Sequence, residues 1–167
     1  MKRQFQMKLD IRISRGFQKH FKKDWLRRLV ECSLGHGAQH SDTDYELGLF
    51  ITNDETVRRL NREYRGVDKA TDVLSFALAE GGGGDSSPSF IMPPDGIVHL
   101  GEVVVSYPRA QEQAEDNGRE VSEEVAWLVV HGVLHLLGYD HDEPARGRRM
   151  RALEKGVLSE VGKDSRK

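Results

Sequence analysis

Alternation of apolar and polar residues predicts the strands of a small β-sheet. Every second residue is apolar in residues 5–13 and again in residues 45–51, the period of a strand with one buried face. Residues 72–78 form a shorter apolar run. Residues 97–105 are the most continuously apolar of the four segments, which favours a position inside a sheet or beside a site.

Apolar residues spaced three or four apart predict helices around these strands. One helix is expected over residues 17–32, and a second follows a capping box at residues 52–55 and ends near Gly66. Ser106 is suited to cap a third helix, and Pro144 to open the last one. The second helix is expected to bury Val57, Leu60 and Tyr64.

The most hydrophobic helix carries two histidines. Within residues 125–137 only His131, Gly132 and His135 interrupt an apolar run, and a helix that is hydrophobic all round belongs at the centre of a fold. With this helix placed centrally, the order β-α-β-α-β-β-α-α-α predicts an α+β protein. We expect a single domain over residues 1–167, with a small mixed sheet of about four strands packed by about five helices.

Two segments are expected to be loops. Residues 80–96 are rich in glycine, proline and serine, a composition that predicts a flexible loop within the domain. Residues 35–44 form the other loop, with His36 and His40 exposed.

The spacing of three histidines indicates a metal site. His131 and His135 are four residues apart, so a helix presents both on one face. Gly138 is suited to end the helix in the left-handed conformation, and the resulting reversal would bring His141 back to the same face. Three neutral imidazole nitrogens with one open position form the ligand set of a catalytic zinc, whereas a structural zinc has four protein ligands.

Composition sets limits on partners and location. The chain has 167 residues and a net charge of −2, so any contact with a polyanion must be local. Cys32 is its one cysteine, which excludes an intrachain disulfide and predicts no disulfide-linked partner. The sequence contains no apolar stretch of membrane-spanning length. We therefore expect a cytoplasmic protein without a membrane partner.

Basic and aromatic residues offer candidate contacts for a nucleic acid. Four arginines fall on one short predicted helix: Arg58, Arg59, Arg62 and Arg65. Such residues make salt-dependent phosphate contacts, although charge clusters are also common on solvated surfaces. Unpaired bases stack on aromatic rings, for which the candidates are Tyr64, Phe76 and Tyr139. Core packing explains these rings equally well.

The residue after the first histidine distinguishes this motif from that of the metallopeptidases. Metallopeptidases of the His-Glu-x-x-His type carry their general base there, whereas this chain has Gly132. A glycine inside a helix costs about 1 kcal/mol relative to alanine, so it is expected to allow a close approach by a neighbouring group. Three carboxylates could instead act as the base or orient a ligand ring, and the sequence does not choose among Glu102, Asp140 and Asp142.

Three motifs together resemble those of the YbeY family of bacterial and organellar endoribonucleases, also called rRNA maturation factors. Residues 131–141 read His-Gly-Val-Leu-His-Leu-Leu-Gly-Tyr-Asp-His, residues 60–76 read Leu-Asn-Arg-Glu-Tyr-Arg-Gly-Val-Asp-Lys-Ala-Thr-Asp-Val-Leu-Ser-Phe, and residues 100–105 read Leu-Gly-Glu-Val-Val-Val. The similarity extends over roughly residues 5–162. Two positions depart from the family pattern, in which proline is usual at Ala70 and aspartate at Glu102.

The resemblance implies an activity and a set of roles. It implies a single-strand endoribonuclease that matures the 3′ end of small-subunit ribosomal RNA and acts in ribosome quality control. The small ribosomal subunit and its RNA would be partners. One Zn²⁺ would be bound by His131, His135 and His141, and Arg65 would be the functional arginine. Two alternatives stay open: a metallopeptidase-like hydrolase, and a non-catalytic ribosome-assembly factor with a structural metal.

Overall fold

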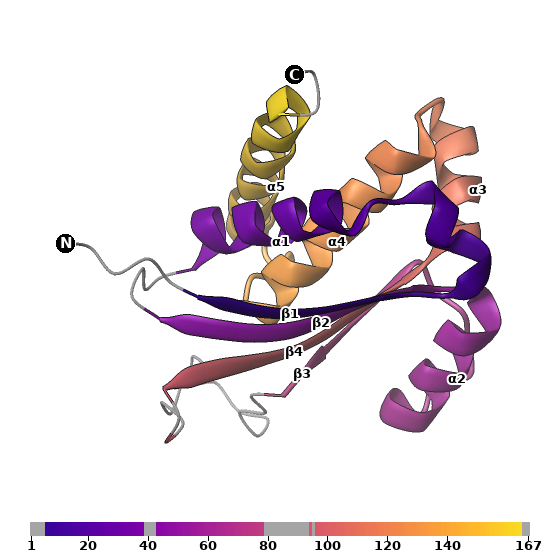
Figure 1. Ribbon diagram of the computed structural model, residues 1–167, viewed down its shortest axis with the longest axis horizontal. Coiled ribbons are helices and arrows are strands. Elements are labelled where there is room, and N and C mark those ends of the chain that lie inside the picture. Colours follow the sequence, from indigo (N-terminus) through magenta and orange to yellow (C-terminus); the bar gives the residue numbers. More distant parts are fainter. Residues whose placement is uncertain (1–5, 39–42, 79–93, 95, 165–167) are drawn as a thin grey trace.

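The computed structural model describes residues 6–38, 43–78, 94 and 96–164 (Figure 1). The strands are β1 (Met7–Ile13), β2 (Asp44–Thr52), β3 (Val73–Ala77) and β4 (Ile97–Ser106). The helices are the 3₁₀ helix η1 (Arg15–His20), α1 (Lys23–Gly37), α2 (Asp54–Arg65), α3 (Tyr107–Asn117), α4 (Val121–Leu136) and α5 (Pro144–Asp164). The predicted α+β class, with about four strands and about five helices, is confirmed.

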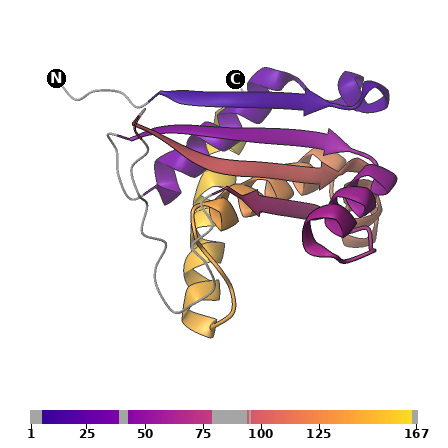
Figure 2. The ribbon, with the colours of Figure 1, turned by 90° about the horizontal axis from the view of Figure 1, so that it is seen from below.

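The four strands form one mixed sheet in the order β1-β2-β4-β3 (Figure 2). β1 and β4 both pair with β2 in parallel, whereas β3 pairs antiparallel with β4. β4 therefore lies inside the sheet, as its continuous apolar sequence predicts.

The two faces of the sheet are covered unequally. α1, α4 and α5 lie on one side and α2 on the other (Figure 1). The larger core lies on the side of α4 and includes Leu49 of β2, Val103 of β4 and Val129 of α4, all fully buried. Under α2 a smaller cluster joins Val57, Leu74 and Val104. Because neighbouring residues of a strand point to opposite faces, Val103 and Val104 belong to different clusters.

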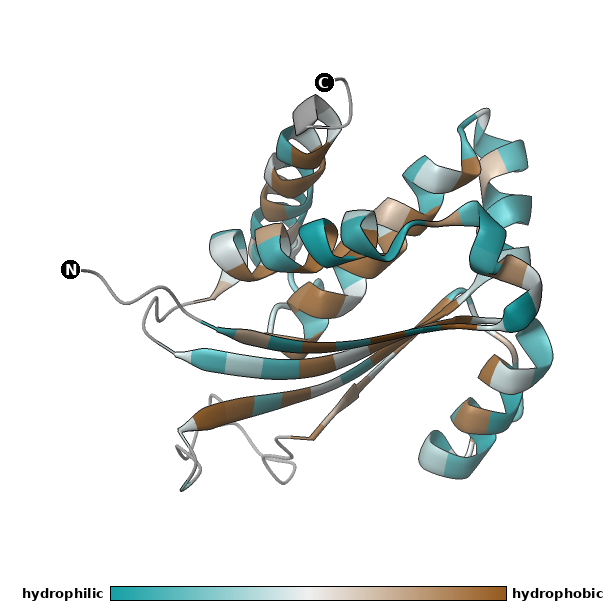
Figure 3. Cartoon of the chain, in the orientation of Figure 1, coloured by the Kyte–Doolittle hydropathy of each residue, from teal (hydrophilic) through white to brown (hydrophobic). Residues whose placement is uncertain are grey.

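α4 packs very closely on the sheet, in a region where both elements are rich in hydrophobic residues (Figure 3). A Cβ atom added to Gly132 would lie 2.6 Å from Cγ1 of Val103. The Ser75 hydroxyl of β3 donates a hydrogen bond of 3.0 Å to the carbonyl oxygen of Gly132. The glycine therefore allows the close approach of neighbouring strands, as its position inside the helix predicts.

Two local predictions about helices are wrong. The helix predicted over residues 17–32 is interrupted, because Phe21 is extended and buries its ring against Tyr107 and Trp25. α1 starts only at Lys23. It continues to Gly37, so His36 lies in the helix rather than in a loop and bonds to Glu160 at 2.7 Å.

α2 ends at Gly66 as predicted, but its N-cap and the burial of Tyr64 differ from the prediction. Its N-cap is Asn53, which accepts a hydrogen bond from the Thr56 amide at 2.8 Å. Thr52 instead ends β2 and accepts a hydrogen bond from Ser14. Tyr64, predicted to be buried, is 70% exposed, although its ring contacts Phe76 of β3 on one side.

Two further predictions concern the loop at residues 80–96 and the absence of a membrane-spanning helix. The flexible loop predicted at residues 80–96 lies outside the described residues, apart from positions 94 and 96. Within the described ranges, every helix is too short or too polar to cross a membrane.

Candidate metal centre

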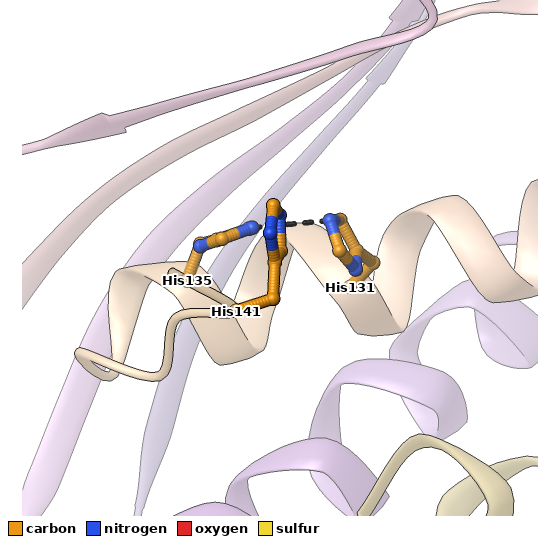
Figure 4. Close-up of side chains that lie close together, drawn as sticks. All are labelled: His131, His135 and His141. Carbon is orange, nitrogen blue, oxygen red and sulfur yellow. Dashed lines mark hydrogen bonds between the residues drawn. The ribbon is translucent and has the colours of Figure 1, made fainter. Parts of the chain in front are cut away.

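The three predicted ligands converge (Figure 4). One ring nitrogen from each of His131, His135 and His141 lies within 4.8 Å of the other two. The Nε2 atoms of His131 and His135 are 3.0 Å apart, as expected for residues one helical turn apart on the same face. In the part of the chain that the structure describes, the cluster contains no fourth histidine, cysteine or carboxylate.

A glycine turn brings the third histidine to the helix. Gly138 has φ = 97°, a conformation that glycine adopts without a Cβ penalty. The amides of Gly138 and Tyr139 donate to the last carbonyl groups of α4, those of His135 and Leu134, both at 3.0 Å. The chain then reverses, so that His141 faces the two helical histidines (Figure 4). The expected helix end at Gly138 is confirmed.

The donor set fits a divalent cation. Burial, and after it the nearby His131, lowers the pKa of His135, so this imidazole is neutral near pH 7, the form that binds metal. The two Nε2 atoms that lie 3.0 Å apart can form a hydrogen bond in which one carries the proton, or can both direct their lone pairs at a cation. Three imidazoles at such distances match the ligands of Zn²⁺ and related ions.

Glu154 of α5 also belongs to the site, although it lies outside the three sequence motifs. Its Oε1 lies 2.8 Å from Nδ1 of His131, and its Oε2 accepts a hydrogen bond of 3.0 Å from Nε1 of Trp127. The Trp127 ring also stacks on His131, with centroids 4.9 Å apart. One signal was present in the sequence: Glu154 shares a helical face with Met150 and Val157, where an apolar residue is the norm.

Arg65 reaches the strand that packs on the histidine helix. From the exposed end of α2, its Nη2 donates to the carbonyl oxygen of Ser75 at 3.1 Å. The hydroxyl of the same Ser75 bonds to Gly132, the neighbour of His131. Arg65 and α4 thus contact one residue of β3 from two sides. Within the described chain, Arg65 has no carboxylate within 4.0 Å.

The other three arginines of α2 that could contact RNA differ in whether they already pair with a carboxylate. Arg58 holds Asp68 through two hydrogen bonds of 2.8 and 3.0 Å, and this contact lowers the pKa of the Asp68 carboxyl. Arg59 lies 3.9 Å from a carboxylate oxygen of Glu63. Arg62 is exposed and, among the described residues, has no carboxylate within 4.0 Å.

The candidate aromatic residues for base stacking differ in their exposure to solvent. Tyr64 is exposed and contacts Phe76, with centroids 5.1 Å apart, next to the Arg65 guanidinium. Tyr139 is half-buried instead, and its hydroxyl donates to the carbonyl oxygen of Gly37 at 2.7 Å. Tyr139 therefore ties the end of α4 to α1, whereas Tyr64 presents an open ring.

The three candidate carboxylates occupy different places. Glu102 points to the opposite face of the sheet, where it pairs with Arg12 and lies against Gly48. Asp142 pairs with Arg146 at 3.5 Å. Asp140 accepts the His141 amide at 2.7 Å, and its charge acts on His135. The structure thus brings Asp140 to the histidines and turns Glu102 away from them.

The fold and the site define an α+β protein with a three-histidine candidate metal centre. A sequence model described as Endoribonuclease YbeY matches residues 11–162. Similar relatives named Endoribonuclease YbeY include one from Roseiflexus sp. strain RS-1, 40% identical over 92% of each chain. Another, from Roseiflexus castenholzii, is 48% identical over 80% of this chain and 82% of its own.

A solved structure shares the fold. The solution structure of TM1509 from Thermotoga maritima superposes with a TM-score of 0.62, covering 95% of this chain and 91% of that one at 24% identity. The sequence comparisons extend over nearly all of the chain, including the three motifs that carry the resemblance. The chain belongs to the YbeY family of endoribonucleases.

Proposed function

We propose that this chain is a zinc-dependent endoribonuclease that cleaves single-stranded RNA. One observation carries the proposal: three histidine nitrogens lie within 4.8 Å of one another in a chain that belongs to this family. His131, His135 and His141 would hold one ion. When bound, a divalent cation with an open coordination position activates water and polarises a phosphoryl oxygen.

Arg65 is proposed to bind a phosphate of the substrate. Its planar guanidinium presents several donors, and among the described residues only the Ser75 carbonyl and the face of Phe76 engage it. That strand contact holds the arginine near the histidine helix through the Ser75–Gly132 bond. Arg62, also exposed, would add charge along the strand of RNA, with Arg58 and Arg59 more weakly, because both already face carboxylates.

Tyr64 supports a single-stranded substrate. Its ring is open to solvent beside Arg65, and a base can stack on such a ring only when it is not paired within a duplex. Asp140, whose charge acts on His135, is proposed to orient a ligand or to accept a proton.

The biological role is proposed from the family. Relatives of this chain are named Endoribonuclease YbeY, and we propose that it acts on the 3′ end of small-subunit ribosomal RNA and in ribosome quality control, in the cytoplasm. Its partners would be the small subunit and its RNA.

The first experiment tests activity and metal together. The purified full chain is stripped with a chelator, reloaded with Zn²⁺, and incubated with labelled single-stranded RNA, duplex RNA and casein. We expect cleavage of single-stranded RNA only, lost on stripping and restored by zinc. Cleavage of casein alone would instead support the metallopeptidase alternative.

A histidine variant separates catalysis from a structural metal. We expect His135→Ala to abolish RNA cleavage and zinc binding while the melting temperature of the metal-free protein stays near the wild-type value. His36→Ala is the matched control, since this histidine of α1 pairs with Glu160 outside the cluster. Zinc binding by the wild type without any RNA cleavage would favour the non-catalytic assembly factor.

Gly132 argues against peptide hydrolysis by the usual route. A glutamate at this position would need space that Val103 and Ser75 occupy, at 2.6 and 3.3 Å from an added Cβ. The carboxylate that serves as base in His-Glu-x-x-His enzymes therefore cannot be accommodated there without moving α4 away from the sheet.

A further inference from the structure

Glu154 is a buried carboxylate in an apolar setting. It is 5% exposed and lies on the face of α5 that also presents Met150 and Val157, both buried. Removing a carboxylate from water is costly unless its oxygens find donors and its charge finds a partner. The presence of Glu154 in this position therefore requires an explanation.

Both oxygens of Glu154 are used, but among the described residues no lysine or arginine nitrogen lies within 4.0 Å of them. Oε1 contacts Nδ1 of His131, and Oε2 accepts from Trp127. Within the described chain, His131 is the only basic residue within 4.0 Å of this carboxylate. Because His131 must be neutral to bind a metal, it does not supply the missing charge.

We propose that Glu154 is a positioning residue that sets the tautomer of His131 and couples metal binding to the packing of α5 on α4. The inference rests on the metal-binding part of the proposed function. A carboxylate only accepts hydrogen bonds, so His131 carries its proton on Nδ1. A neutral imidazole has a single N–H, and Nε2 is therefore left with a free lone pair.

The free nitrogen is the one that faces the cluster. Nε2 of His131 lies 3.0 Å from Nε2 of His135, while the opposite nitrogen faces Glu154. Partners of this kind orient histidine ligands and raise their basicity in metal sites. A dication held by the three imidazoles would also compensate the buried carboxylate through the His131 ring, which accounts for the absence of a lysine or arginine.

α5 contacts a second ligand near its start. Gly147 is buried, and a Cβ atom added there would lie 3.6 Å from Cβ of His141. The helix therefore supports His131 through Glu154 and His141 through the backbone at Gly147. Two of the three ligands depend on the position of α5.

Glu154→Gln tests this role with little change in shape. The glutamine has one carbonyl oxygen and one amide nitrogen, so it cannot accept at both ends. If the oxygen accepts from Trp127, the amide group donates to Nδ1 of His131 and forces the proton onto Nε2. We expect zinc affinity to fall by about 10–100-fold, measured by competition with a chromophoric chelator. The visible spectrum of the Co²⁺-substituted protein should change as well.

Glu160→Gln is the matched control on the same helix. Glu160 contacts Nε2 of His36 at 2.7 Å, but its side chain is 46% exposed and lies outside the cluster. We expect this variant to bind zinc with wild-type affinity. A zinc affinity of Glu154→Gln equal to that of the wild type, with only a lower melting temperature, would overturn the proposal and leave Glu154 a packing residue.

A measurement on the wild type keeps the test decisive if Glu154→Gln does not fold. Imidazole ¹⁵N NMR of the metal-free chain, at a pH where the rings are neutral, should show the Nδ1–H tautomer for His131. The Nε2–H tautomer would overturn the proposal. A wild-type chain that binds no zinc would overturn the proposed metal dependence. Equal zinc binding by the wild type and Glu154→Gln would overturn only the role of Glu154.

Discussion

The two faces of the sheet use similar pairs of side chains in different ways. On the α4 face, Nδ1 of His131 lies 2.8 Å from Glu154, and the two side chains are 15% and 7% exposed. On the opposite face, Nδ1 of His99 lies 3.1 Å from Glu46, with side chains 38% and 44% exposed. The two distances are similar, but one pair is buried and the other is partly exposed to solvent.

The difference indicates that burial, and not the contact itself, fixes the orientation of a histidine side chain. His99 borders an open groove of about 600 Å³ whose lining includes Lys8, Asp10 and Arg12. Water and neighbouring charges compete there, and exposed pairs of this type contribute about 0–1 kcal/mol. His131 is fixed by a buried carboxylate, a stacked indole and a close-packed helix. An imidazole held in one orientation needs little further ordering to bind an ion.

The largest expected effect concerns Arg65, which stands at the edge between the two faces. Arg65→Ala should lower RNA turnover by about 10²–10³-fold, the usual result of removing a donor to developing charge. Its hydrogen bond to Ser75 is exposed, so the free energy of unfolding should change by no more than about 1 kcal/mol. Single-turnover kinetics and chemical denaturation measure the two quantities.

Two further variants sharpen the result for Arg65. Arg65→Lys keeps the charge but not the planar set of donors, so it should recover only part of the turnover. Arg27→Ala, on the exposed side of α1, should behave as wild type. Loss of stability in proportion to turnover in Arg65→Ala would place the arginine among the structural residues of α2.

The next effect tests the close packing of the α4 face. Gly132→Ala should lower the free energy of unfolding by about 1 kcal/mol, because overpacking costs about 1–3 kcal/mol and exceeds the gain in helix propensity of about 1 kcal/mol. The added Cβ would lie 2.6 Å from Val103 on an interior strand, where a β-branched side chain has little freedom to move.

Gly35→Ala is the control for this packing effect. Gly35 is exposed in α1, and a Cβ atom there meets nothing within 4 Å. The same substitution should therefore stabilise the protein by about 0.5–1 kcal/mol. Chemical denaturation of both variants gives the comparison, and stabilisation by Gly132→Ala would contradict the close contact with β4.

The sequence predicts those features that depend on residues close in the chain. The alternation in β2, the helical spacing of His131 and His135, and the turn at Gly138 are local, and the structure confirms each of them. The convergence of His141 with the other two histidines follows from that same turn.

Features that depend on distant contacts were missed or misjudged. Tyr64 continues the apolar spacing of α2, yet its ring contacts Phe76 of β3 on one side only and stays 70% exposed. Phe21 interrupts a regular helical pattern because Tyr107, far along the chain, offers a packing partner. Glu154 gains its role from His131, 23 residues away. Its place within an apolar stripe was visible in the sequence, but its partner was not.

The smallest effect concerns pH, because it comes from a single group on the buried face. Burial lowers the pKa of His135 in the folded protein, with the charge of His131 acting in the same direction, whereas in the unfolded chain the value is about 6.5. Above that pH both states are neutral at this residue, and its contribution to stability is complete. As the pH falls below about 6.5, the unfolded state takes up the proton first, so the metal-free protein loses stability until the lowered folded-state pKa is passed. Toward acid, the melting temperature of the metal-free wild type should fall relative to that of His135→Asn, which lacks this titrating group. A constant difference between them would contradict a lowered pKa of His135 in the folded protein.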